Sequence, residues 1–207
     1  MFLNIVAVLC AFFIGGIPFG VLIARAGGIK DIRSFGSGNI GATNVLRTLG
    51  WKYGLSCFIV DILKGFAPVA IAGSFLGIEG AWLAAVAVAT ILGHDYSPYL
   101  EFQGGKGVAS TLGAAFFFDW RVALLAFGTW VVLVALTRYV SLGSIIGGLS
   151  ATLWYYLLNG YDEQAAILGG LFILGVMIVI RHEGNIRRLL AGEERKLGQK
   201  AAEVEEQ

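Results

Sequence analysis

The sequence has few charged residues, and this scarcity excludes an ordinary soluble protein. Only 14% of its 207 residues are charged, against about 25% in soluble domains. In contrast, 57% are hydrophobic and the mean hydropathy is +0.77. A soluble fold of this length could not bury so much apolar surface. The composition therefore predicts a protein that has lipid as its solvent.

Cysteine and histidine are also scarce, which removes further classes of function. Both cysteines, Cys10 and Cys57, stand inside apolar runs, so we expect neither a disulfide framework nor a thiolate metal site. The two histidines lack further ligands at metal-binding spacing, and we predict no metal and no cofactor. A formal net charge of +1 gives no reason to expect a nucleic-acid partner.

Apolar runs predict an all-α integral membrane protein with seven transmembrane helices. A helix that crosses the bilayer upright needs about 20 residues. The third and fourth runs are shorter, so they could be tilted, extend into their flanks or form a re-entrant hairpin. The seven runs are residues 2–24, 53–76, 81–92, 108–118, 122–136, 140–158 and 165–180.

Basic residues predict the orientation of these helices. None precedes the first run, which also lacks a small-residue cleavage site, so we interpret it as a retained span rather than a signal peptide. With the N-terminus outside and the C-terminus cytoplasmic, all of the fifteen Lys and Arg except Lys64 and Arg121 fall on the cytoplasmic side. Five spans plus a hairpin fit equally well. We expect one membrane-embedded domain over 1–198 and a charged cytoplasmic tail over 199–207.

Three polar, glycine-rich stretches should meet on the cytoplasmic side. They are residues 35–47 (FGSGNIGATNVLR), 93–108 (GHDYSPYLEFQGGKGV) and 181–188 (RHEGNIRR). Each combines glycines with hydrogen-bond donors and at least one cation. Glycines allow successive backbone N–H groups to turn toward one anion, and a following helix adds its positive end. The pattern predicts a phosphate-binding site.

Particular side chains suit this chemistry. Arg47 can bind phosphate oxygens in pairs, and Lys106 offers a compact positive charge. Any one of these residues could instead be a solvated cation or a turn residue, and only the three stretches together favour a site. The remaining hydrogen bonds could come from Ser37, Asn39, Thr43, Asn44 and Asn185.

Two nucleotide-binding motifs fail in their context. Residues 36–41 match G-x-G-x-x-G, but Asp61, the acidic residue 20 positions on, stands in an apolar run and no βαβ unit surrounds it. Lys106 follows a glycine as in a P-loop, but Gly107 replaces the required Ser or Thr. We therefore reject a dinucleotide site and a nucleotide triphosphatase.

The remaining ionisable groups have structural and functional interpretations. His94 is expected to organise its turn, whereas His182 could donate to phosphate or carry a proton. Asp61 and Lys64 are three residues apart in an apolar run and are expected to pair with each other.

Three motifs, GSGNIGATNVLR, GHDYSPYLEFQGGKGVA and RHEGNIRRLLAGEE, carry a resemblance over nearly the whole chain. In this order and spacing they resemble the bacterial acyl-phosphate-dependent glycerol 3-phosphate acyltransferases, the PlsY family. The resemblance implies a multi-pass enzyme of the bacterial inner membrane with a cytoplasmic site. Its partners would be acyl phosphate, glycerol 3-phosphate and membrane lipids. By motif position, catalytic contacts would come from Ser37, Arg47, Lys106, His182 and Asn185, and substrate binding from Gly38, Asn39, Thr43, Asn44, Gly104 and Gly105.

The expected mechanism is direct acyl transfer. Neither histidine is followed by Asp at the spacing that other glycerol 3-phosphate acyltransferases use, and no nucleophile triad is evident. Acyl phosphate is already activated, so positioning and charge stabilisation could supply much of the rate. The proton acceptor would be His182 or a substrate phosphate. A transporter of a phosphate-bearing solute is the main alternative, and a non-catalytic scaffold is another. Transport predicts polar groups through the whole bilayer, whereas here the core is apolar outside Asp61 and Lys64 and the polar groups cluster on one side.

Overall fold

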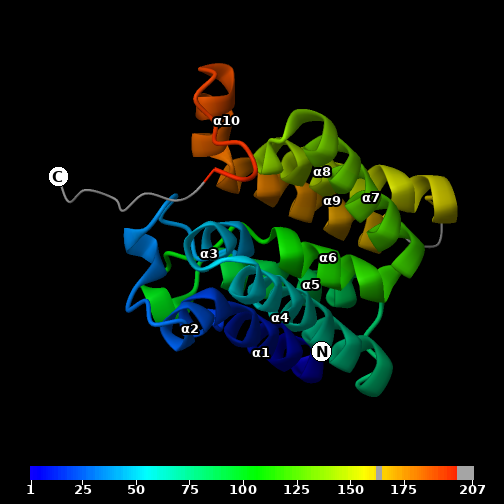
Figure 1. The fold of residues 1–207 in the computed structure, drawn as a ribbon. Coiled ribbons are helices and arrows are strands. Elements are labelled where there is room, and N and C mark those ends of the chain that lie inside the picture. The colour runs from blue at the N-terminus through cyan, green and yellow to red at the C-terminus, as the bar shows by residue number, and fades with distance from the viewer. Residues whose placement is uncertain (162–164, 200–207) are drawn as a thin grey trace.

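A computed structural model describes residues 1–161 and 165–199, and it is a bundle of helices (Figure 1). The apolar runs predicted from the sequence are helical, except that the first is divided into two helices. Two further short helices, which the sequence analysis did not delimit, stand in the polar stretches: α3 (Ala42–Leu49) and α10 (Glu183–Leu190). The helices that carry the apolar runs are α1 (Phe2–Gly16), α2 (Phe19–Ala26), α4 (Trp51–Ala70), α5 (Gly80–Asp95), α6 (Val108–Phe118), α7 (Trp120–Thr137), α8 (Val140–Asn159) and α9 (Ala165–Arg181).

Only some of these helices are long enough to cross a bilayer. Among the described residues, four helical stretches have the required length and hydropathy, namely Phe2–Ala26, Trp51–Phe75, Trp120–Thr137 and Val140–Asn159. A fifth is added if α9 and α10, which meet at 59°, are one broken span. Helices α5 and α6 have 16 and 11 residues. The helical membrane fold is therefore confirmed, and the number of seven spans stays a prediction.

The first apolar run is broken at Ile17 and Pro18, between α1 and α2. Proline has no N–H to continue the helix, and at the break the Ile17 carbonyl accepts from the Phe19 N–H, two residues on, at 3.0 Å instead of from an N–H four residues on. The Ile17 carbonyl accepts a hydrogen bond of 2.9 Å from Lys64 Nζ of α4. An intramembrane lysine thus satisfies the backbone of a neighbouring broken helix.

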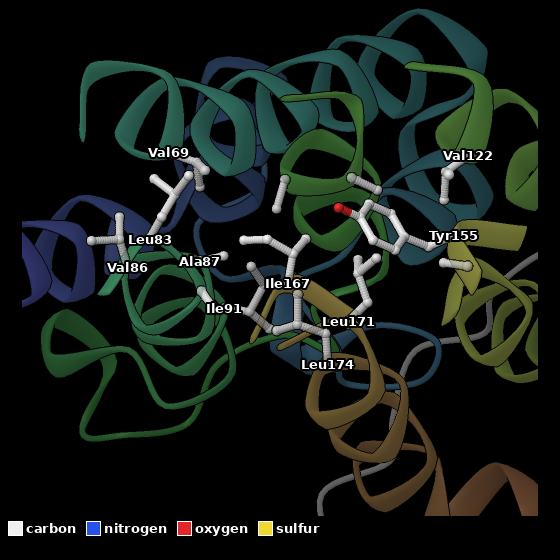
Figure 2. Close-up of a cluster of buried hydrophobic side chains, with 14 of the residues drawn as sticks. Val69, Leu83, Val86, Ala87, Ile91, Val122, Tyr155, Ile167, Leu171 and Leu174 are labelled. Atoms are coloured by element: carbon white, nitrogen blue, oxygen red, sulfur yellow. The ribbon is translucent and has the colours of Figure 1, made fainter. Parts of the chain in front are cut away.

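Helix α5 lies inside the bundle and packs against α1, α4 and α9. Figure 2 shows its side chains Val86, Ala87 and Ile91 in the same buried cluster as Leu171 and Leu174 of α9. A helix that is covered by protein on several sides does not need to match the thickness of the lipid. This position explains how a short run can be part of a membrane fold.

Small residues allow the helices to approach closely. Gly113 of α6 faces the Ile62 carbonyl of α4, and Gly65 of α4 faces the Ser110 backbone of α6. A methyl group at either glycine would overlap the backbone of the other helix. Close backbone contact is how helices associate in lipid, where the hydrophobic effect gives little help.

All three polar stretches lie at one end of the bundle. Figure 1 shows α3 and α10 at this end, and α3 packs against α2. The second stretch joins them through contacts between its glycine backbone and Arg181 at the end of α9. The fold thus brings together segments that are up to about 140 residues apart in the chain, as Arg47 and Asn185 are.

Substitution of Gly113 by Ala should destabilise the protein. The new methyl group would meet backbone atoms of α4 that cannot move aside alone, and overpacking of this kind costs about 1–3 kcal/mol. Thermal unfolding in detergent should show a lower Tm. Gly128→Ala in α7 is the matched control, since nothing lies within 4 Å of its new methyl group. Equal Tm values for the two variants would contradict the packing argument.

Candidate active site

A cavity of about 780 Å³ opens where the three polar stretches meet. Its volume is within the usual range for small-molecule sites. One wall is polar and the other is apolar. The polar wall includes Arg33, Ser37, Thr43, Arg47, Lys106, His182, Asn185, Arg188 and Glu194. The apolar wall includes Leu55, Phe58, Val108, Phe127 and Trp130.

The first polar stretch is a loop folded around the side chain of Asn44. Its Oδ1 accepts a bond of 3.0 Å from the Ser37 N–H, and its Nδ2 donates to the carbonyls of Phe35 and Asn39 at 2.9 Å. Gly38 has a φ of +69°, which favours glycine, and this turn exposes Ser37. Asn44 therefore braces the loop that presents Ser37 to the cavity.

Arg47 extends from α3 into the cavity and also holds the segment that follows α10. Its Nη2 donates to the Arg195 carbonyl at 3.2 Å. A second attachment joins the Leu197 N–H to the Arg138 carbonyl at 2.7 Å, and Arg138 Nη2 donates to the Leu197 carbonyl at 2.9 Å. Burial lowers the pKa of Arg47, but a guanidinium stays charged in proteins.

The second polar stretch places Lys106 by fixing its backbone. The N–H groups of Gly104 and Gly105 donate to the carbonyls of Asp95 and His94, at 3.1 and 2.9 Å. Arg181 Nε donates to the Gly105 carbonyl at 3.0 Å from α9. Both glycine N–H groups are therefore committed to the end of α5 in this structure.

Lys106 lies deep in the polar wall, where its Nζ donates to Asn185 Oδ1. Burial lowers the pKa of this ammonium to about 8. The positive charges of Arg188, Arg181 and Arg47 lower it further, and the carboxylate of Glu194 opposes them. Lys106 is thus charged at neutral pH and becomes neutral not far above it.

His182 lies at the bend between α9 and α10. Its Nδ1 is 2.8 Å from the Ile178 carbonyl, which can only accept, so Nδ1 carries the proton. Burial, together with the nearby Lys106 charge, lowers the pKa of His182 to about 4. At neutral pH the ring is therefore neutral, and Nε2 is an acceptor.

Glu194 is a member of the site that the sequence analysis did not single out. It is buried, and its carboxylate accepts from Asn185 Nδ2 at 2.7 Å and from Arg188 Nε at 2.8 Å. Burial raises the pKa of Glu194, but these hydrogen bonds prevail and lower it overall. The sequence did contain one indication of this role. Glu194 and Arg188 both belong to the third motif, on either side of Gly192.

Two charged residues lie below the polar wall, inside the bundle. Lys64 Nζ is 3.0 Å from Asp61 Oδ1, so the pairing predicted from their spacing is confirmed. Both side chains are at most 4% exposed. Asp61 and His94 also border the floor of the cavity.

The structure brings together most of the residues predicted for the site. Gly104 and Gly105 are the exceptions, since they lie behind Lys106 and do not border the cavity. The substrate roles of all these residues stay predictions. No group of three or more metal-ligating side chains occurs within 1–161 and 165–199. The predicted residues that border the cavity are Ser37, Gly38, Asn39, Thr43, Asn44, Arg47, Lys106, His182 and Asn185.

The apolar wall continues into the bundle. Phe127 and Trp130 of α7 stack with a centroid separation of 5.6 Å, and Phe58 of α4 lies 6.1 Å from Phe127. Behind these rings is a smaller apolar cavity of about 50 Å³ between α6, α7, α8 and α9. An anion-binding wall beside an apolar wall suits a ligand with a phosphate head and a hydrocarbon tail.

The fold is that of a helical integral membrane protein, and its cavity has a cationic wall beside an apolar wall. Residues 5–192 match the model of a protein family described as glycerol-3-phosphate acyltransferase. The chain belongs to this family, and the resemblance found in the three motifs is confirmed.

Individual relatives agree with this assignment. The glycerol-3-phosphate acyltransferase of Thermotoga petrophila is 47% identical over 186 residues, which cover 90% of this chain and 92% of that protein. The crystal structure of PlsY, an integral membrane glycerol 3-phosphate acyltransferase, in its glycerol 3-phosphate form superposes with a TM-score of 0.88 at 42% identity. It covers 94% of this chain and 96% of that one. The lysophosphatidic acid form superposes with a TM-score of 0.86 at 40% identity, covering 95% and 96%.

Phosphate binding should weaken as the pH rises through about 8, because Lys106 then loses its charge. Affinity for inorganic phosphate should fall by about twofold between pH 7 and 8 and by up to about tenfold per unit at higher pH. Titration of the purified protein with labelled phosphate between pH 7 and 10 measures this. Lys106→Arg is the control, since its guanidinium keeps its charge, and the fall should disappear. The same fall in both proteins would exclude Lys106 as its source.

Proposed function

We propose that this protein transfers a fatty acyl group from acyl phosphate to the 1-hydroxyl of glycerol 3-phosphate. The products are 1-acyl-glycerol 3-phosphate (lysophosphatidic acid) and inorganic phosphate, and the reaction begins bacterial phospholipid synthesis. Family membership supports the acceptor and the reaction class. The related PlsY crystal structures are a glycerol 3-phosphate form and a lysophosphatidic acid form, which supports an acceptor and a product of this kind.

The observation that carries the proposal is the division of the cavity into a cationic and an apolar wall. Two phosphate groups, one on each substrate, need several positive charges within one space. Arg47, Lys106 and Arg188 supply them from three separate polar stretches. The acyl chain needs an apolar surface, where each buried CH₂ contributes roughly 0.8 kcal/mol. Phe58, Phe127 and neighbouring side chains supply that surface.

The proposed chemistry is a single displacement. The 1-hydroxyl oxygen of glycerol 3-phosphate attacks the carbonyl carbon of acyl phosphate, and a new ester C–O bond forms. The bond between that carbon and the phosphate oxygen breaks, and inorganic phosphate leaves with the electron pair. Arg47 and Lys106 hold the phosphates, while Ser37 and Asn185 hydrogen-bond the reacting groups. These donors are fixed in place, so they lower the barrier by stabilising the negative charge that develops in the transition state.

The proton of the attacking hydroxyl goes to a phosphate oxygen in this proposal. His182 has a pKa of about 4, too low for an efficient base near neutral pH. A phosphate monoester has its second pKa near 6, which is better matched. His182 Nε2 would instead accept a hydrogen bond from a hydroxyl of glycerol 3-phosphate and orient that substrate. This assigns the proton to one of the two acceptors considered from the sequence.

The proposed arrangement in the membrane follows from the basic loops. Seven segments cross or enter the bilayer, with the N-terminus outside and the C-terminus in the cytoplasm. The site then faces the cytoplasm from the inner membrane, where water-soluble glycerol 3-phosphate is available. Residues 1–198 form the catalytic unit and 199–207 a charged tail, of which only residue 199 is among the described residues.

Purified protein in detergent, given acyl phosphate and glycerol 3-phosphate, should form lysophosphatidic acid and phosphate in equal amounts. Mass spectrometry of the quenched enzyme should find no acyl-enzyme, since no covalent step is proposed. A trapped acyl-enzyme would overturn the single displacement. Flux of glycerol 3-phosphate into vesicles without product would overturn the enzyme assignment in favour of transport.

Lys106→Met should lower kcat/KM by at least about 100-fold, because a buried charge that binds the reacting phosphate is lost. His182→Ala should lower kcat by about 10- to 100-fold through lost orientation of the acceptor. Lys52→Met, at an exposed lysine outside the cavity, is the matched control and should keep normal turnover. Normal turnover in both site variants would show that this cavity is not the catalytic site.

A further inference from the structure

The buried ionisable residues below the cavity have no part in the proposed chemistry. Asp61, Lys64 and His94 are at most 5% exposed and come from α4 and α5. Burial of such groups is costly unless they are paired. These residues form a series of neighbours between the break in the first span and the loop that carries Lys106.

The contacts begin at the broken first helix. Lys64 Nζ donates to the Ile17 carbonyl and lies 3.0 Å from Asp61 Oδ1. Asp61 Oδ1 in turn lies 3.9 Å from His94 Nδ1, and Asp61 Oδ2 accepts from the Cys57 thiol at 3.7 Å. One edge of the His94 ring therefore faces the Asp61 carboxylate, at a distance too long for a direct hydrogen bond.

The opposite edge of the His94 ring supports Gly105. A methyl group built on Gly105 would overlap Nε2, Cδ2 and Cε1 of His94, so this edge of the imidazole lies directly against the glycine Cα. Gly104 makes a similar contact with the backbone, since its methyl group would overlap the His94 carbonyl oxygen. His94 thus contacts the two glycines that immediately precede Lys106, Gly105 through its ring and Gly104 through its carbonyl oxygen.

The loop is held on its other sides as well. Arg181 donates to the carbonyls of Gly105 and Gly104 at 3.0 and 3.4 Å, and its guanidinium lies 4.9 Å from the centre of the Tyr96 ring. The backbone before Lys106 thus has little freedom to move. Movement away from α5 is opposed by hydrogen bonds, and movement toward it is opposed by the His94 ring.

We propose that His94 is a positioning residue that supports Gly105 and thereby places the Lys106 ammonium in the phosphate-binding wall. His94 and Asp61 border the cavity, but one edge of the imidazole faces Asp61 and the other faces Gly105. The ring acts through the loop rather than on the substrate. Because the role of Lys106 belongs to the proposed function, this inference rests on that function.

A double-mutant cycle tests the contact between the ring and the glycine. Gly105→Ala should lower kcat/KM by roughly 100-fold, since its methyl group meets the ring and displaces Lys106. His94→Ala should lower it by about tenfold, because the support is removed. The double variant should lose no more than His94→Ala alone, within about threefold, because the clash is absent.

Gly104→Ala is the matched control for this cycle. Its methyl group meets the His94 carbonyl oxygen, which remains when the side chain is removed. The losses of Gly104→Ala and His94→Ala should therefore multiply in the double variant. If Gly105→Ala lost the same factor with and without the His94 ring, the two residues would act independently and the inference would be overturned.

Two conservative replacements separate the edges of the ring. His94→Gln keeps an atom that can reach Gly105 and should retain activity within about threefold of the native protein. His94→Asn preserves only the shorter reach toward Asp61 and should resemble His94→Ala. In His94→Ala and His94→Asn, KM for glycerol 3-phosphate should rise while Tm changes little. Loss of folded protein would not produce this combination. The reverse order of Gln and Asn would overturn the role of the Gly105 contact.

Binding of inorganic phosphate distinguishes failure of this inference from failure of the proposed function. If the native protein makes no lysophosphatidic acid, the proposed function fails, but phosphate affinity still reports the position of Lys106. The same cycle is then measured by phosphate titration, with Lys106→Met defining the affinity without the ammonium. Rescue of Gly105→Ala by His94→Ala supports the inference in either readout, and its absence in both overturns it.

Discussion

A helical protein in lipid has to satisfy its backbone hydrogen bonds within the chain, and this constraint decides where the site can lie. The longer stretches of non-helical backbone lie at one end of the bundle, where side chains and neighbouring helices complete many of their hydrogen bonds. Asn44 does this for the first loop, and Arg181 together with the end of α5 does it for the second. Once these loops are braced, their glycines and cations converge on one cavity. The same constraint explains the use of Lys64 at the break in the first span.

Electrostatic balance is the second requirement of the cavity. Several cations in a small volume repel one another, and their repulsion together with burial lowers the pKa of Lys106 to about 8. Glu194 offsets this repulsion by binding Asn185 and Arg188 with its two oxygens. Asn185 connects that carboxylate to Lys106 through the other end of its amide. The Glu194 carboxylate and the Asn185 amide thus keep the cations together when no phosphate is bound.

The sequence was sufficient to predict the apolar helices and the meeting of the three polar stretches, because hydropathy and glycine-linked donors are local patterns. It also predicted the pairing of Asp61 with Lys64, since both lie on one helix face. The role of Glu194, the brace formed by Asn44 and the contact of His94 with Gly105 were beyond it. These depend on distances between segments that only the fold sets. Whether α5 and α6 cross the bilayer was also undecidable from length, since burial of α5 inside the bundle removes the need to match lipid thickness.

The attachment of the C-terminal segment has a consequence for its tolerance to substitution. Arg47 and Arg138 hold this segment through the main-chain atoms of Arg195 and Leu197, not through their side chains. Any residue other than proline can offer the same N–H and carbonyl groups. Positions 195 and 197 can therefore change their side chains while the segment stays attached through its main chain to Arg47 and Arg138.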